Sequence, residues 1–341
     1  MKIDAKFFAE RIGDAPTLVQ TYRELGYDGL FATETRHDPF LPLMLAAEHG
    51  QGLDLSTRVA LAFSRSPMHL AYLGHDLQAY TEGRFTLGLG SQVQAHIVHR
   101  FGATWSQPIS RMREAIQAIR AIWRSWDDGT SLNFRGELYQ HTLMTPFFSP
   151  RPNPYGQAPI FLAAVGPRMT ELAGEVADGL VIHDFSTERY IRTVTMPALQ
   201  RGLEKAGRGR ADVQVVCPGV VVTGSTEKDY LDVLSRTRSR IAFHASTAAY
   251  RRVLDVHGWG DLYAQLNVLS HQRKWSEMAR LISDDILETF AVVGPPEEIA
   301  AKLLSRYGDL ADRISLDLPG VSREQAADLL RGLKSPVAEL G

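Results

Sequence analysis

Short apolar runs that alternate with longer amphipathic segments are the feature that most constrains how this chain folds. Runs that are apolar throughout predict strands buried on both faces, as in a parallel sheet. Eight βα units in 341 residues predict an α/β fold, a (β/α)8 TIM barrel with insertions. The predicted strands are 2–8, 29–33, 58–63, 84–90, 160–165, 179–183, 213–222 and 313–318. The predicted helices include 15–25, 41–49, 68–81, 106–126, 167–177, 188–206, 230–243, 249–256, 277–286 and 296–307.

A doubly wound sheet is the competing fold, and it usually carries a glycine fingerprint after its first strand. Residues 7–11, Phe-Phe-Ala-Glu-Arg, contain no glycine. The rhythm breaks only at about 127–159, which holds five prolines. This Pro-rich insertion is compatible with a small hairpin and a polyproline-like stretch. It interrupts a barrel more naturally than it divides two domains, so we expect one domain over residues 1–341.

Composition excludes several classes of protein. No apolar run reaches the ~18 residues that a membrane span needs, and the N-terminus lacks the apolar core of a signal peptide. The single cysteine, Cys217, cannot form an intrachain disulfide framework, and it lies in an apolar run where a packed core residue is expected. A net charge of −2 disfavours a nucleic-acid binder. We therefore expect a cytoplasmic enzyme with no membrane or nucleic-acid partner.

The densest group of polar residues follows the second predicted strand, where barrel active sites lie. The run Glu34-Thr35-Arg36-His37-Asp38 places a histidine beside carboxylates and an arginine, which suits acid–base work. The alternative is a solvated loop with local ion pairs. His96 and His99 are spaced i, i+3 but lack a neighbouring third ligand, so no metal site is expected.

Two other strand ends are rich in small residues. Gly88 and Gly90 permit a close backbone approach to a flat or anionic ligand, although such a pair is also common in turns. Gly166-Pro167 opens a predicted helix whose N–H groups suit a phosphate or a flavin edge. The alternative there is a plain βα turn. Ser186 and Thr187 after the sixth strand could be helix caps alone.

Taken in chain order, several segments resemble the luciferase-like monooxygenase superfamily. They are 26–31, Glu34, 81–91, 163–167, 172–179 and 292–299. This resemblance implies a (β/α)8 barrel of the bacterial luciferase type, usually homodimeric, that uses reduced FMN or the deazaflavin coenzyme F420. The sequence is most similar to the F420-dependent branch in residues 35–40, 92–96 and 172–183.

The same resemblance assigns cofactor contacts by position. Relatives often hold a non-prolyl cis peptide in the loop that here is Ala62, Phe63 and Ser64, behind the ring system. Contacts to the ring or its side chain fall on Gly90, Ser91 and Gln92. Contacts to the ring side chain or phosphate fall on Ala164, Val165 and Gly166, and the phosphate region also includes His183 and Ser186. The acidic tail of F420 implies a basic groove, for which the candidates are Arg65, Arg100, Arg111 and Arg113.

One departure from the family pattern concerns the second strand end. Many relatives carry a histidine directly after the acidic residue, whereas here Glu34 is followed by Thr35 and the histidine is His37. Our hypothesis is hydride transfer between F420 and a small organic substrate at the barrel mouth. His37 would carry the proton and Glu34 would tune it.

Three other functions stay open at this point. The fold could bind reduced FMN and activate oxygen as a two-component monooxygenase. It could be a metal-dependent hydrolase that uses His37, Asp38 and His183, or a barrel that carries or senses a cofactor without catalysis.

Overall fold

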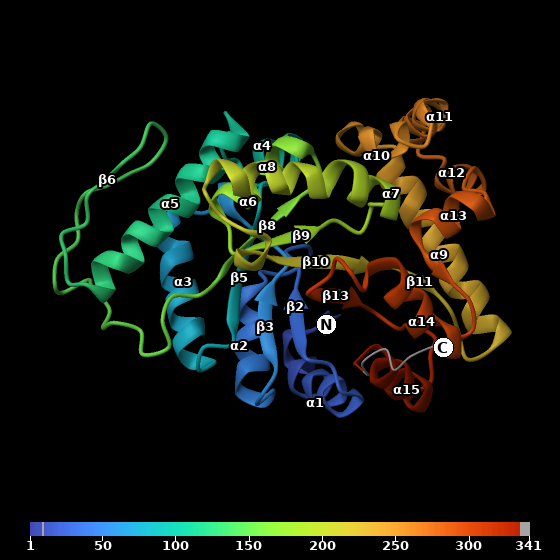
Figure 1. Ribbon diagram of the computed structural model, residues 1–341, viewed down its shortest axis with the longest axis horizontal. Helices are drawn as coiled ribbons and strands as arrows, with labels where there is room; N and C mark the ends of the chain where they lie inside the picture. Colours follow the sequence, from blue (N-terminus) through green and yellow to red (C-terminus); the bar gives the residue numbers. More distant parts are fainter. Residues whose placement is uncertain (9, 335–341) are drawn as a thin grey trace.

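The computed structural model describes residues 1–8 and 10–334, and its centre is a closed barrel of parallel strands (Figure 1). Neighbouring strands pair in the order β3-β2-β1-β13-β10-β9-β8-β5, and a pairing of β3 with β5 closes the ring. The predicted (β/α)8 barrel is therefore confirmed. The barrel strands are β1 (Lys2–Lys6), β2 (Gly29–Ala32), β3 (Asp54–Thr57), β5 (Phe85–Gly90), β8 (Ile160–Ala164), β9 (Gly179–Ile182), β10 (Gln214–Gly219) and β13 (Arg313–Leu316).

Amphipathic helices cover the outside of the barrel, because the outward side chains of each strand are apolar and need a cover. The bounds of α1 and α14 are those that the sequence predicts. The final helix, α15, was not predicted. The covering helices are α1 (Ala15–Leu25), α2 (Phe40–His49), α3 (Pro67–Tyr80), α4 (Gln94–His99), α5 (Pro108–Asp127), α6 (Pro167–Val176), α7 (Glu188–Tyr190), α8 (Met196–Lys205), α14 (Pro296–Tyr307) and α15 (Arg323–Lys334). None of the helices in the described part of the chain is long and apolar enough to cross a membrane.

The third strand corrects two expectations. It begins at Asp54 and is broken by a cis peptide bond between Arg58 and Val59, after which β4 (Ala60–Leu61) continues it. The expected cis peptide at 62–64 is wrong, because those residues form a 3₁₀ turn and the cis bond recorded among the described residues lies upstream. The Arg58 side chain is buried at this break, and its Nη1 donates to Ser315 Oγ at 2.9 Å.

Charged side chains fill part of the barrel interior. Arg313 Nε donates to Asp4 Oδ2 at 2.7 Å and Arg313 Nη1 to Asp54 Oδ2 at 2.8 Å, and Arg58 also pairs with Asp4. Burial alone would raise the pKa of Asp4, but the two arginines outweigh it and hold that pKa below its usual range. Gly29 completes the layer, because a Cβ there would lie 2.6 Å from Asp4 Oδ1.

The Pro-rich insertion forms the expected hairpin, from β6 (Phe134–Arg135) and β7 (Gln140–His141). The hairpin projects from one end of the molecule beside α5 (Figure 1). Glu114 of α5 fastens it, since its carboxylate accepts N–H bonds from Leu138 at 2.8 Å and Tyr139 at 3.1 Å.

A second insertion stands at the opposite end of the molecule (Figure 1). It lies between β11 (Val221–Val222) and β12 (Val292–Val293), which pair with each other. Its helices pack around their own apolar cluster, in which Phe185 and Phe290 stack at 4.5 Å. The predicted helix over 277–286 is wrong, since residues 281–283 interrupt it, and α11 was not predicted. The helices are α9 (Glu227–Ala245), α10 (Arg251–Asp255), α11 (Gly260–His271), α12 (Trp275–Arg280) and α13 (Asp284–Phe290).

Candidate active site

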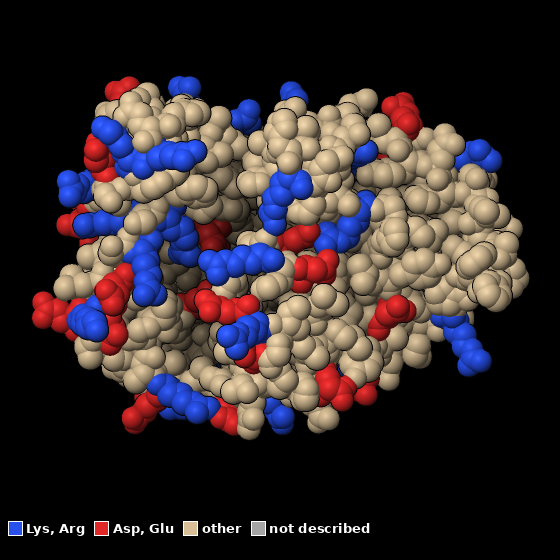
Figure 2. Space-filling model, turned by 180° about the vertical axis from the view of Figure 1, so that it is seen from behind, with Lys and Arg blue, Asp and Glu red and all other residues tan. Residues whose placement is uncertain are grey.

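The carboxyl ends of the barrel strands meet at one end of the barrel, the mouth, because the strands are parallel. The structure brings every predicted cofactor segment to this end. They follow β4, β5, β8 and β9 in turn, and Glu34 follows β2. Figure 2 shows a hollow on one face of the molecule with acidic and basic side chains on its rim. The net charge of −2 is thus compatible with basic groups gathered locally, which can attract an anion.

Glu34 is held by the loop after β4 and keeps 7% of its surface exposed. Its Oε2 accepts hydrogen bonds from the Leu61 N–H at 2.8 Å and from Arg65 Nη1 at 2.6 Å. Arg65 Nη2 in turn donates to Asp38 Oδ2 at 2.6 Å. This bridge fixes the loop after β2 against the loop after β4, and it uses the carboxylate that the sequence assigned to acid–base work.

His37 is exposed. Its Nε2 lies 3.1 Å from the carbonyl oxygen of Glu10. A carbonyl can only accept, so Nε2 carries the proton in the neutral ring and Nδ1 keeps a free lone pair. Among the described residues, the structure records no bond between Glu34 and His37. Any effect of Glu34 on His37 passes through the loop that Arg65 holds.

At the end of β5, the Gly90 backbone packs closely against the side chain of Val59. A Cβ on Gly90 would lie 2.5 Å from Val59 Cγ2, so only glycine lets the two segments pack. Gln92 has a φ of 58°, and its Oε1 accepts the Val93 N–H at 3.0 Å. The local bond steadies a backbone conformation that a residue with a side chain rarely adopts. Ser91 and Gln92 keep accessible surface, whereas Gly90 is buried.

The end of β8 leaves open space beside the start of α6. A Cβ on Gly166 would meet no atom within 4 Å, and Gly166 has no side chain to cap the first turn of α6. The Val165 carbonyl is held by the Tyr190 hydroxyl at 3.0 Å. Uncapped N–H groups beside a free space fit a phosphate group, so these residues suit the cofactor that the sequence implies.

The end of β9 carries a cluster of rings. His183 Nε2 lies 3.2 Å from the hydroxyl of Tyr250, and the His244 ring is 5.0 Å from the His183 ring. Burial first, and then the neighbouring His183, lower the pKa of His244 to about 4. Ser186 is 1% exposed, so its hydroxyl lies beneath the surface of the mouth.

Asp317 is a mouth residue that the sequence analysis missed. The predicted last strand ran to residue 318, but β13 ends at Leu316, so Asp317 is the first residue past the strand. Its Oδ1 accepts the Lys6 N–H at 2.9 Å. Burial raises the pKa of Asp317, and the Lys6 N–H only partly offsets that effect. The side chain is exposed, although protein atoms around the carboxyl group are close enough to raise its pKa. The signal in the sequence is an acid within the alternating segment 313–318, Arg-Ile-Ser-Leu-Asp-Leu, shortly before Pro319-Gly320.

The four arginines proposed for a basic groove do not share one role. Arg65 is committed to Glu34 and Asp38. Arg113 pairs with Glu175 of α6, with Nε donating to Oε1 at 2.8 Å. Arg100 donates to the Thr35 carbonyl and Arg111 to the Tyr139 hydroxyl at 3.2 Å. Within the described residues, the last two have no acidic partner and stay candidates for an anion.

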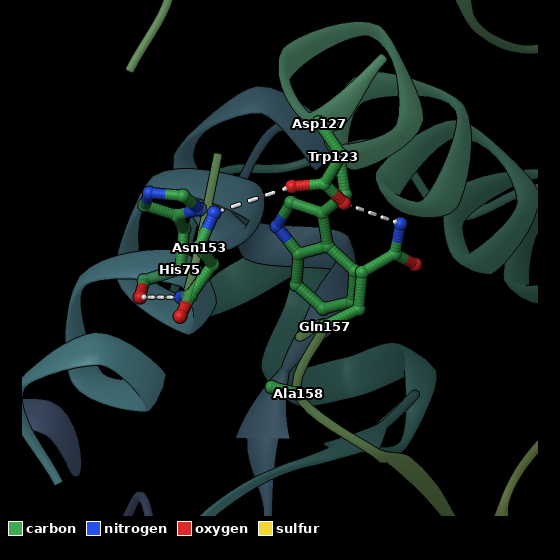
Figure 3. Close-up of a pocket in the computed structure, with 6 residues that line it drawn as sticks. All are labelled: His75, Trp123, Asp127, Asn153, Gln157 and Ala158. Atoms are coloured by element: carbon green, nitrogen blue, oxygen red, sulfur yellow. Dashed lines mark hydrogen bonds between the residues drawn. The ribbon is translucent and has the colours of Figure 1, made fainter. Parts of the chain in front are cut away.

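Two hollows lie away from the mouth. The first, between α3, α5 and the segment 153–158, is closed by its own polar groups (Figure 3). Asn153 Nδ2 donates to the His75 carbonyl at 3.0 Å, and Gln157 Nε2 donates to Asp127 Oδ2 at 2.9 Å. These bonds attach the segment 153–158 to α3 and α5, so this hollow has a structural role. The second, about 520 Å³, lies at the amino ends of β8, β9 and β10, where barrel residues usually serve stability.

The residues required for a metal-dependent hydrolase are not brought together. His37 contacts Glu10, Asp38 pairs with Arg65, and His183 contacts Tyr250. No group of three His, Cys, Asp or Glu residues in the described part of the chain is arranged to hold a metal ion. Cys217 is buried in β10, and burial raises the pKa of its thiol to about 12, as expected for a core residue.

A model of the luciferase-like monooxygenase family matches residues 4–313, so the chain belongs to this family. It is 49% identical over 289 residues to an uncharacterized protein of Mycobacterium tuberculosis, with 85% of each chain covered. It is 25% identical over 299 residues to the 5,10-methylenetetrahydromethanopterin reductase of Archaeoglobus fulgidus, again with 85% of each covered.

Solved structures share the fold. The coenzyme F420-dependent tetrahydromethanopterin reductase from Methanopyrus kandleri matches with a TM-score of 0.79 at 17% identity, over 97% of both chains. The oxygenating constituent of 3,6-diketocamphane monooxygenase from Pseudomonas putida, a complex with FMN, matches with a TM-score of 0.66 at 15% identity, over 98% of this chain and 95% of that one. The proteins that this chain resembles thus include an F420-dependent reductase and an FMN-binding monooxygenase.

Replacement of Asp317 by asparagine is expected to stabilise the protein at pH 7. A raised pKa means that the protonated carboxyl favours the folded state. That contribution is complete below the ordinary value of 3.8 and is lost as the pH rises through the folded-state pKa. Asparagine is neutral at every pH. The difference in free energy of unfolding between variant and wild type, measured with urea, should therefore become smaller from pH 7 to pH 4.

Asp309→Asn is the matched control with the opposite sign. The hydrogen bond from Arg192 lowers the pKa of Asp309, so its contribution is present above 3.8 and is lost only as the pH falls through the lower folded-state value. This variant is expected to be less stable than wild type at both pH 7 and pH 4. An Asp317→Asn protein that is less stable than wild type at pH 7 would show that Asp317 is not desolvated.

Proposed function

We propose that this protein is an F420-dependent oxidoreductase that transfers a hydride between coenzyme F420 and a small organic substrate at the barrel mouth. One observation carries the proposal: the tight wall at Gly90 and the open, uncapped helix start at Gly166 occur at the same end of the barrel. Backbone without a side chain at the end of β5 lets a flat ring approach closely, and uncapped helix N–H groups bind a phosphate. Two similar proteins support the choice of cofactor: the F420-dependent glucose-6-phosphate dehydrogenase of Amycolatopsis mediterranei, 24% identical over 311 residues, and the F420-dependent reductase from Methanopyrus kandleri.

The residues of the mouth would divide the work in binding. Gly90, Ser91 and Gln92 would present backbone and small side chains to the ring, while Val165 and Gly166 would hold the phosphate region. Bound F420 supplies a ring carbon that accepts or gives a hydride and reacts poorly with oxygen. The protein then has to orient the substrate against that carbon and exclude water.

We propose His37 as the group that moves the proton. Its Nδ1 keeps a free lone pair because Nε2 faces the Glu10 carbonyl, so the neutral ring can accept a proton without losing its existing bond. Glu34 contributes indirectly, since its bond with Arg65 fixes the loop that carries His37.

The alternative is a two-component monooxygenase that binds reduced FMN. The observation in its favour is the structural likeness to an FMN complex. The two proposals differ in cofactor and in oxygen consumption, and both quantities are measurable.

Cofactor titration tests the proposal directly. With F420 and FMN titrated in parallel and followed by fluorescence, F420 is expected to bind at least about tenfold more tightly, a difference of roughly 1.4 kcal/mol. Reduced F420 should then be oxidised by at least one compound in a panel of aldehydes, ketones and enones, without oxygen uptake. Tighter binding of FMN together with oxygen uptake would favour the monooxygenase, and turnover without either cofactor would exclude both.

His37→Ala is expected to lower kcat by about 10²- to 10⁴-fold, the usual worth of a positioned proton-transfer group. The Kd for F420 should stay within about twofold of wild type, because the imidazole is not placed in the cofactor wall. His271→Ala removes an exposed histidine of α11 and serves as the control, with no change expected. Wild-type turnover in the His37→Ala variant would show that another group transfers the proton, and Asp317 would be the next residue to test.

A further inference from the structure

The hydrogen bonds of His183 decide which of its ring nitrogens carries the proton. The Phe185 backbone N–H donates to Nδ1 at 3.0 Å, so Nδ1 holds no proton. Burial lowers the pKa of His183, and the ring is therefore neutral with its proton on Nε2. That nitrogen lies 3.2 Å from the hydroxyl oxygen of Tyr250. The Nε2–H thus donates to Tyr250, whose oxygen accepts.

Tyr250 is left with a proton to donate. A hydroxyl whose oxygen accepts one bond still has its own O–H available, and no acceptor for it is recorded among residues 1–8 and 10–334. Burial, reinforced by Asp184, raises the pKa of Tyr250, so the phenol keeps this proton at neutral pH. Its side chain is only half-buried. The hydroxyl is therefore a donor whose partner has to come from outside the described chain.

The position of the pair places this donor at the mouth. His183 is the first residue past β9, and Tyr250 ends the 3₁₀ turn Ala248–Tyr250 of the second insertion. Figure 1 shows that insertion beside α7, the helix that follows β9. Asp184 and Arg240 influence the pKa of both His183 and Asp317. Because β9 and β13 both pair with β10, the end of β9 that carries His183 lies near the end of β13.

We propose that Tyr250, oriented by His183, donates a hydrogen bond to a ligand oxygen that carries no proton of its own: a carbonyl, carboxylate or phosphate oxygen. Tyr250 is the residue that touches the ligand, and His183 is a positioning residue. The inference rests on the proposed function, because that function makes the mouth the binding site. Such an oxygen can belong to the cofactor or to the substrate, and the experiment separates the two sources.

Neighbouring rings hold the Tyr250 side chain in place. The Tyr250 ring lies 4.8 Å from the His183 ring, 5.4 Å from the His244 ring and 5.6 Å from the Phe185 ring. Packing on these sides fixes the ring, and a fixed donor binds without the entropy cost of ordering a free side chain. A tyrosine that only anchored the turn would be expected to donate its hydroxyl proton to another group of the protein.

The test is Tyr250→Phe in the full chain, with Tyr263→Phe of α11 as the control for loss of a phenol in the same insertion. If the oxygen belongs to the cofactor, the Kd for F420 is expected to rise about 3- to 10-fold, the usual worth of one hydrogen bond. If it belongs to the substrate, the Kd for F420 stays unchanged and the KM of the panel compound rises by that factor, or kcat falls by it. Thermal unfolding of both variants checks that they fold.

Equal Kd, KM and kcat for Tyr250→Phe, Tyr263→Phe and wild type would overturn the inference. A second arm needs no cofactor: ¹⁵N NMR of the histidine rings should show His183 protonated on Nε2, and a proton on Nδ1 would overturn the inference by itself. Failure of F420 to bind the wild-type protein would instead remove the proposed function, so the two failures are distinguishable.

Discussion

The ion pairs inside the barrel are the interaction on which the rest of the structure depends. Asp4 of β1, Arg313 of β13 and Asp54 of β3 join these three strands, and Arg58 adds the segment where the third strand breaks. Burying these charges is costly, and removing one partner of such a group typically costs about 3–5 kcal/mol because the others are left unpaired. The cluster therefore holds the strands in one register, and the strand register places the loops of the mouth.

The two sides of the mouth are built differently. On the side of β2 and β4, the bridge from Glu34 through Arg65 to Asp38 is complete within the protein. On the side of β9 and β13, polar groups lie in the wall with bonding capacity left over. Ligand chemistry is therefore expected from groups whose bonds within the protein are incomplete, which on the β2 side means His37 Nδ1, while the satisfied bridge keeps the loops in place.

Much of the barrel was predictable because its outer strand faces are apolar and its helices are amphipathic. The third strand was placed too late, since Asp54 and Ser56 are polar and break the apolar run. The reason is structural: Asp54 pairs with Arg313 in the barrel. Asp317 was missed for the related reason that periodicity locates a strand end only within a few residues. Glu34 was found as a site residue, but its partner Arg65 comes from a loop that is distant in sequence.

Transfer of isotope from the cofactor tests the central claim most directly. Reduced F420 labelled with deuterium at its hydride-bearing carbon, mixed with the protein and a panel compound in ordinary water, should give a product that carries one deuterium on carbon and no oxygen from O₂. A product whose new hydrogen comes from the solvent, or one that contains oxygen from O₂, would contradict hydride transfer at the mouth.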